Sequence, residues 1–123
     1  MGLRNAILVF ISLTAFGCKG GTYSIGSTEI APIKPSETTF FEVSMRIGHD
    51  RANQAVDMTV VCPPDLTVEP MTQRIVLDDA GDGKIRYTVT AEENANAGEK
   101  KVKVTANVSF RLKVSHEITV KVK

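Results

Sequence analysis

The stretch VKVTANVSFRLKVSHEITVKV, residues 102–122, decides the fold class because its apolar residues recur at every second position. Apart from His116, every even position is apolar, and every odd position is polar. A period of two is typical of β-strands with one buried and one solvated face. A single strand of this length would be unusual in a small domain, so the stretch predicts a β-hairpin.

The unbroken alternation restricts how this hairpin can turn. Directly opposed residues of an antiparallel pair share a face, so the loop must hold an odd number of residues. We expect three or five residues centred on Ser109, which would set Ala106 against Leu112. His116 would then face inward opposite Val102. We interpret His116 as a half-buried structural residue, because no cluster of possible metal ligands accompanies it in the sequence.

The same alternation extends towards the N-terminus, over residues 41–47, 56–62 and 85–91. Proline and glycine separate these runs, most clearly at Pro63-Pro64 and at Gly81-Asp82-Gly83. No window of helical length shows apolar residues spaced by three and four. The sequence therefore predicts an all-β fold, an immunoglobulin-like antiparallel β-sandwich of about seven strands preceded by an N-terminal signal segment.

Length and composition limit the function classes. The chain has 123 residues, a net charge of +1, 42% apolar residues and 24% charged residues. This length fits one domain and excludes a large multidomain enzyme. The near-neutral charge argues against a nucleic-acid partner, and the ordinary composition argues against long disorder or a polytopic membrane protein.

The first 17 residues have the pattern of an export signal. Arg4 supplies a positive charge, residues 6–16 are almost entirely apolar, and Gly17 is a small residue before Cys18. The apolar run is too short to span a bilayer as a stable helix. We therefore predict a signal peptide over residues 1–17, an attachment cysteine with a short linker over residues 18–29, and the sandwich over residues 30–123.

Two kinds of cleavage fit this signal. The stretch Ala15-Phe16-Gly17-Cys18 resembles a bacterial lipobox, which implies a diacylglycerol on Cys18 and a cut just before it. Ala15 and Gly17 also satisfy an ordinary signal peptidase. We favour lipidation, because Cys18 follows the apolar run directly and flexible residues 19–22 come next. Cys62 would then be an unpaired, inward-facing thiol that behaves as a small hydrophobe.

The alternative is a secreted or periplasmic, unlipidated domain that binds protein or carbohydrate and carries a Cys18–Cys62 disulfide. The lipidated form would attach to the membrane through its N-terminal lipid. Lys19 follows the cysteine where many lipoproteins retained at an inner membrane have an acid. We therefore expect a position in the cell envelope, at the outer membrane or the cell surface.

Four stretches together resemble a known family. They are Lys34-Pro35-Ser36-Glu37-Thr38, Leu66-Thr67-Val68-Glu69-Pro70, Tyr87-Thr88-Val89-Thr90-Ala91 and the run from Ala95 to Ala106. This order is similar to that of bacterial immunoglobulin-like modules of the NEW3/CARDB type, and it covers about residues 30–123. Lys101 stands where these modules commonly have an aromatic residue. The resemblance implies a stalk, spacer or adhesive module without catalytic residues.

One cluster of acidic residues is a candidate metal site. Asp78, Asp79 and Asp82 surround a Gly-rich turn that superficially suggests a calcium loop, but the EF-hand pattern fails at Ala80 and at Val89. An acidic hairpin turn is the favoured interpretation. No residues form a nucleophilic triad, so we expect no enzyme, no cofactor and no small-molecule substrate.

The charge distribution indicates a possible partner surface. Six basic residues near the C-terminus project from the solvated side of the predicted hairpin: Lys101, Lys103, Arg111, Lys113, Lys121 and Lys123. They could form a face that rests on anionic lipid or on an acidic polymer of the envelope. They could also be lysines that protect a sheet edge against pairing with other chains, which is the interpretation we favour. The expected partner is another envelope protein or polymer.

Overall fold

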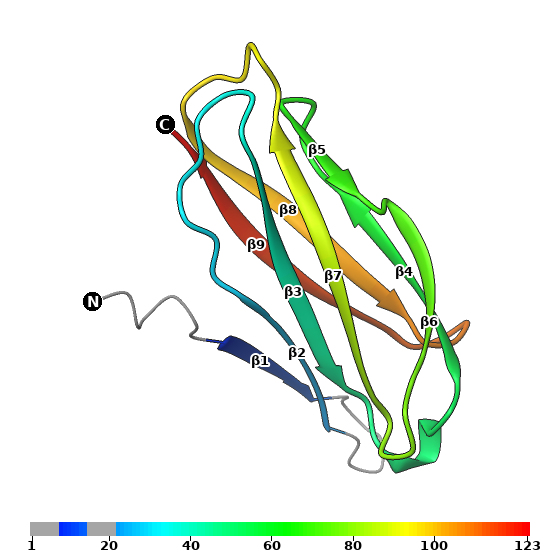
Figure 1. The fold of residues 1–123 in the computed structure, drawn as a ribbon. Coiled ribbons are helices and arrows are strands. Elements are labelled where there is room, and N and C mark those ends of the chain that lie inside the picture. Colours follow the sequence, from blue (N-terminus) through cyan, green and yellow to red (C-terminus); the bar gives the residue numbers. More distant parts are fainter. Residues whose placement is uncertain (1–7, 15–21) are drawn as a thin grey trace.

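Nine strands form two antiparallel sheets in the residues that the computed structural model describes, which are 8–14 and 22–123. The strands are β1 (Leu8–Thr14), β2 (Thr22–Thr28), β3 (Thr38–Arg46), β4 (Ala55–Val61), β5 (Leu66–Glu69), β6 (Thr72–Val76), β7 (Asp82–Ala91), β8 (Gly98–Asn107) and β9 (Lys113–Val122). One sheet has the order β1-β2-β3-β7-β5 and the other the order β6-β4-β8-β9 (Figure 1). The predicted immunoglobulin-like β-sandwich is confirmed.

The core lies between the sheets and is built from the alternating apolar positions. The inward residues of β3 and β7 that the alternation predicted, such as Val43 and Val89, are buried. Phe41 and Tyr87 stack at the centre, with ring centroids 5.3 Å apart. Each large apolar side chain buried in this way contributes about 1.5–3 kcal/mol relative to an exposed one. The period of two in the sequence thus becomes the contact between the two sheets.

The hydroxyl of Tyr87 is an exception within this apolar core. It is buried and has no hydrogen-bond partner among the described residues. Burial disfavours the phenolate and raises the pKa of Tyr87 to about 12. The aromatic ring therefore stabilises the core through packing, while the hydroxyl loses its hydration without compensation.

The sandwich begins earlier in the chain than predicted from the sequence. Residues 18–29 were predicted to be a linker, but β2 occupies residues 22–28 and pairs with β3 from Ser24↔Arg46 to Ser27↔Val43. Ile25 is fully buried in the core. The alternation is hard to recognise here, because Ser27 takes an inward position that a large apolar residue would normally hold. The linker prediction is wrong for residues 22–28.

The C-terminal hairpin has the odd loop length that the alternation predicted, but its centre differs. Five residues, 108–112, join β8 to β9, and the backbone N–H groups of Val108 and Ser109 both donate to the carbonyl of Leu112, at 2.9 and 3.1 Å. The loop is therefore centred on Phe110 rather than Ser109. His116 faces inward as predicted, but it lies opposite Val104 and not Val102.

One end of the sandwich, here called the η2 end, contains the 3-10 turn η2 (His49–Arg51), the end of β3, the start of β7 and the loop 108–112. The side-chain amide of Gln54 donates to the carbonyl of Val108, which ties this loop to the residues after η2. Strand β2 also starts at this end, because Ser24 pairs with Arg46. The C-terminus lies at the opposite end (Figure 1).

Within the described ranges, no helix is both long enough and apolar enough to cross a membrane.

Candidate interaction site along strand β2

A buried hydrogen bond joins the two sheets beside β2. Ser27 lies on β2 in the five-stranded sheet and His116 on β9 in the four-stranded sheet, with Ser27 Oγ 3.1 Å from His116 Nε2. The residues are 4% and 5% exposed and are the buried polar ones in the described part of the chain. Both take positions that the alternation points inward. The contact therefore fixes the side of the sandwich where β2 and β9 face each other.

The environment of His116 favours its neutral form. Burial lowers the pKa of the imidazole, because the apolar surroundings disfavour the charged ring. Its second nitrogen, Nδ1, is buried and has no hydrogen-bond partner in the residues that the structure describes. A charged ring would leave that N–H without a partner as well. His116 therefore acts as a neutral hydrogen-bonding residue between the sheets.

A serine paired with a histidine is also part of many nucleophilic sites. In such sites a third group, usually a carboxylate, binds the other imidazole nitrogen and stabilises the imidazolium. Nδ1 of His116 has no such partner in the described ranges, and Ser27 is itself buried. The pair matches a structural contact, in agreement with the structural role predicted for His116.

Next to this pair, a cavity of about 420 Å³ opens between the sheets. It lies between residues 27–32 and β9, and its lining includes Ser27, Ile30, His116 and Ile118. Glu29 and Lys121 add charged groups to it. The cavity therefore combines apolar and polar lining on the side of the molecule where β2 and β9 face each other.

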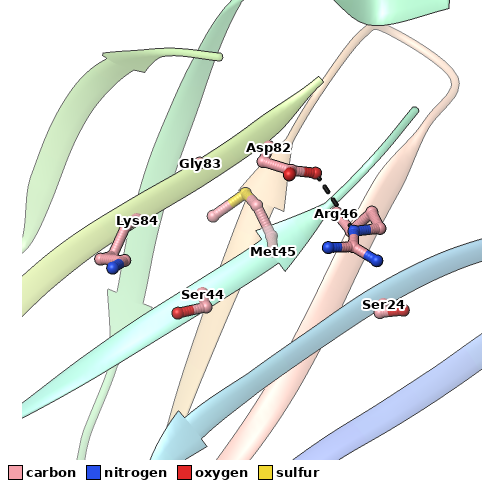
Figure 2. A pocket seen from close by; sticks show the side chains of 7 residues that line it. All are labelled: Ser24, Ser44, Met45, Arg46, Asp82, Gly83 and Lys84. Carbon is pink, nitrogen blue, oxygen red and sulfur yellow. Dashed lines mark hydrogen bonds and ion pairs between the residues drawn. The ribbon is translucent and has the colours of Figure 1, made fainter. Parts of the chain in front are cut away.

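A second cavity, of about 360 Å³, lies on the outer face of the five-stranded sheet and borders β2 at Ser24 (Figure 2). Ser24 of β2, Ser44 and Arg46 of β3 and Lys84 of β7 line it. Arg46 Nε lies 3.3 Å from Asp82 Oδ1, and the Arg46 side chain is largely exposed. Strand β2 is thus flanked by one cavity on its outer face and another beside its inner face.

The predicted acidic candidates for a metal do not converge. The carboxylate of Asp78 accepts the N–H groups of Asp82 and Ala80, both at 2.9 Å, and these hydrogen bonds lower its pKa. The carboxylate of Asp82 pairs instead with Arg46, and Asp79 is exposed. No group of three or more His, Cys, Asp or Glu suited to a metal ion occurs in the described ranges. Asp78 serves to hold the turn.

The basic residues near the C-terminus do share one face. Lys101, Lys103, Lys113 and Lys121 lie at exposed positions of β8 and β9, with Arg111 in the loop and Lys123 after the last strand. Two acids interrupt the face, since Glu117 pairs opposite Lys103 and Glu99 opposite Lys121. Lys101 Nζ donates to Thr119 Oγ1 at 3.0 Å. The face is therefore cationic but mixed.

The chain has two cysteines, Cys18 and Cys62. Cys18, the predicted lipidation site, lies outside the described residues. Cys62 follows β4 and is half-buried, and its thiol donates to the carbonyl of Leu66 at 3.6 Å. Burial raises the pKa of this thiol, which keeps it protonated and unreactive.

Sequence reasoning did not find the site along β2. It placed residues 22–28 in a linker and gave Ser27 no role. The one available signal was Tyr23 and Ile25 at alternate positions, too short a run to distinguish a strand from a linker. The contact between Ser27 and His116 joins residues 89 positions apart, which no local pattern can reveal.

Comparisons with known proteins give no match by sequence and a distant likeness in structure. No family model matches the chain, and no curated protein matches it by sequence. The chain is similar in structure to the ASH/PapD-like domain of human CEP192 (PapD-like domain 7), with 9% sequence identity and a TM-score of 0.49. The match covers 80% of this chain and 83% of that one. The two antiparallel sheets themselves place the fold in the class of immunoglobulin-like sandwiches.

Proposed function

We propose that this protein is a small cell-envelope lipoprotein, anchored by a lipid on Cys18, that presents its sandwich as a non-catalytic structural or protein-interaction module. One observation carries the proposal. The lipobox-like Cys18 stands four residues before Thr22, the first residue of β2. Four residues reach at most about 14 Å, so a lipid there would hold the η2 end close to the bilayer.

The position of Cys62 supports the tether over the alternative disulfide. Cys62 contacts Leu66, and Leu66 pairs with Ala91 at the end of the sandwich opposite to η2. The nine residues of β3 span roughly 26 Å between these ends, at about 3.3 Å per residue. A disulfide needs Cα atoms within about 7 Å. A Cys18–Cys62 bridge would therefore require more chain than lies between Cys18 and β2.

The η2 end also carries an exposed aromatic residue. Phe110, at the tip of the loop between β8 and β9, is 92% exposed, and the basic residues Arg111 and Lys113 follow in the sequence. Phenylalanine on an apolar surface enters the boundary between head groups and acyl chains, and lysine and arginine favour anionic head groups. This combination supports an orientation in which the η2 end faces the membrane.

The lipid itself would supply most of the attachment. Each buried methylene contributes about 0.8 kcal/mol, so two or more acyl chains anchor a protein stably without a membrane-spanning helix. The cationic face of β8 and β9 could add contact with anionic lipid or an acidic envelope polymer, at about 1 kcal/mol for each basic residue near the surface. Lys19 after the cysteine favours the outer membrane or the cell surface.

Intact-protein mass spectrometry of the membrane-extracted protein tests the proposal. The expected mass is that of a chain beginning at Cys18 with a diacylglycerol attached. The Cys18→Ser variant is the matched control and should lack the lipid mass. A chain that has lost two hydrogens through a Cys18–Cys62 disulfide, or that carries no lipid, would overturn the lipoprotein and favour the secreted binding domain.

A further inference from the structure

The four strands that can border the two sheets differ in how they are protected against pairing with other chains. Strand β9 has Lys113, Glu117 and Lys121 along its length, and β6 has Arg74. Strand β5 has four residues and ends with Glu69 before Pro70. Charges, proline and short length are the usual means by which an edge avoids pairing.

Strand β2 has none of these features. Its sequence, TYSIGST over residues 22–28, contains no charge and no proline. In the full chain β2 is not an edge, because β1 pairs with it along its whole length. Removal of residues 1–17 would take β1 away and leave β2 as an unprotected edge with unpaired backbone groups.

Strand β1 indicates which kind of segment can pair with this edge. It runs antiparallel to β2 in one continuous register from Leu8↔Thr28 to Thr14↔Thr22, with Ile11 opposite Ile25. Its sequence, LVFISLT, is uncharged. By register, its residues 9, 11 and 13 lie opposite Ser27, Ile25 and Tyr23. The complement of the edge is thus an uncharged extended segment with apolar residues at alternate positions.

We propose that, in the processed protein, the exposed edge of β2 binds such a segment from a partner protein, as an added antiparallel strand in the register that β1 holds. This inference rests on the removal of residues 1–17 that the proposed function includes. Backbone hydrogen bonds give such pairing its affinity, and pockets for alternate side chains give it specificity. The cavity beside Ser27 and His116 lies next to β2 and could hold an inward side chain of such a strand.

A second copy of this chain fits the edge less well when both copies are tethered. Antiparallel pairing of two β2 strands would place Thr22 of one copy beside Thr28 of the other. The seven residues of β2 separate these positions by roughly 20 Å, at about 3.4 Å per residue. The four-residue tether reaches about 14 Å. If the η2 end of one copy faces the membrane, the tether of the second copy would be too short to reach the same membrane.

A disulfide test can read both the binding and its register. The processed protein, purified from membranes with Ser24→Cys and Cys62→Ala, is mixed with a peptide of residues 8–14 that has lysine pairs at both ends. In one peptide Ser12→Cys supplies the thiol, because Ser12 lies opposite Ser24. In the control peptide Phe10→Cys supplies it, two residues out of register and beyond the Cα separation that a disulfide allows.

We expect the Ser12→Cys peptide to form the disulfide, mapped by mass spectrometry, at least tenfold faster than the Phe10→Cys peptide. The Ser12→Cys peptide with Val9→Lys and Ile11→Lys added should no longer form the disulfide. Equal rates for the two cysteine peptides would overturn the proposal, as would a dimer in light scattering with its β2 edge protected from hydrogen exchange. The latter result would assign the edge to a second copy.

The intact mass of the same preparation separates this inference from the proposed function. A processed chain that lacks lipid but cross-links in register would refute the lipid anchor and support the edge. A lipidated chain that shows no preference for register would refute the edge and support the anchor. A chain that retains residues 1–17 would refute both, because β1 would then keep β2 covered.

Discussion

Ser27 Oγ on β2 and His116 Nε2 on β9 lie 3.1 Å apart and join the two sheets through a buried hydrogen bond. This contact ties the first strand after Cys18 to the last strand of the domain. It therefore links the segment that we propose as a partner-binding edge to the body of the sandwich. The same contact makes the stability of the fold sensitive to the protonation of one residue.

Stability should fall as the pH drops from 7.5 to 5.0. Burial lowers the pKa of His116 in the folded state below its ordinary value of 6.5. The contribution of the neutral imidazole is fully present above about pH 6.5 and is lost as the pH falls through the lowered pKa. The loss cannot exceed about 1.4 kcal/mol per pH unit for one proton. Urea unfolding at the two pH values measures it.

The His116→Leu variant is the control for this pH dependence. It should be equally stable at pH 7.5 and 5.0, since it has no imidazole to protonate. The carboxylates with lowered pKa values, Asp57, Asp65 and Asp78, act below this range, because their contribution is lost only as the pH falls below about 4. A wild-type protein that is as stable at pH 5.0 as at pH 7.5 would contradict the burial of His116.

Gly81→Ala should be strongly destabilising. Gly81 has a φ of +81°, and a Cβ there would lie 1.8 Å from the carbonyl oxygen of Gly48. The backbone strain alone costs about 1–2 kcal/mol, and the clash with backbone atoms adds to it. Thermal or urea unfolding should show a loss of more than about 3 kcal/mol.

Gly98→Ala provides the matched control for that substitution. Gly98 has a φ of +135°, but nothing lies within 4 Å of its added Cβ. It should therefore show only the conformational cost of about 1–3 kcal/mol. If Gly81→Ala were no more destabilising than Gly98→Ala, the close approach of the two turns at the η2 end would be refuted.

Tyr87→Phe should leave the fold intact and increase its stability by up to about 1 kcal/mol, because the removed hydroxyl is buried and unpaired. The stacked ring, which packs against Phe41, would remain. Chemical unfolding compares this variant with Tyr23→Phe, which alters a half-buried tyrosine at the start of β2 and should change stability little. A loss of more than about 1 kcal/mol for Tyr87→Phe would show that the hydroxyl has a partner.

Phe110→Ser should weaken membrane contact without weakening the fold. The ring is 92% exposed, so stability should change by less than about 0.5 kcal/mol. Partial burial of the ring in lipid contributes about 1.4 kcal/mol, which corresponds to a tenfold change in partitioning. Sedimentation of the Cys18→Ser protein with neutral and anionic vesicles measures the change. Phe40→Ser, which removes a half-exposed ring from the outer face of β3, should sediment like the parent protein.

The vesicle experiment also tests the cationic face. Stronger sedimentation with anionic than with neutral vesicles at low salt would support contact through the lysines of β8 and β9. Equal sedimentation with both would assign these lysines to protection of the sheet edge.

The core strands could be predicted from the sequence because runs such as residues 41–47 and 85–91 alternate without interruption. The start of the domain could not, because β2 places Ser27 and Gly26 where a pattern-based reading expects stronger strand formers. The predicted centre of the hairpin loop was wrong by one residue for a related reason. Phe110 continues the apolar parity of its neighbours, yet it lies at the loop tip and is exposed, so its parity gives no information about burial.

The site along β2 depends on tertiary structure in a way that no sequence pattern encodes. The acidic turn at residues 78–83 looked like a possible metal loop because carboxylates are close in sequence. In the fold, Asp78 binds backbone N–H groups and Asp82 binds Arg46, so proximity in sequence does not produce convergence in space.

Detergent phase partitioning of the native protein tests the tether most directly. We expect the wild-type protein in the detergent-rich phase and the Cys18→Ala variant in the aqueous phase, with the same β-rich circular dichroism for both. Recovery of the wild-type protein in the aqueous phase would contradict an anchored envelope module.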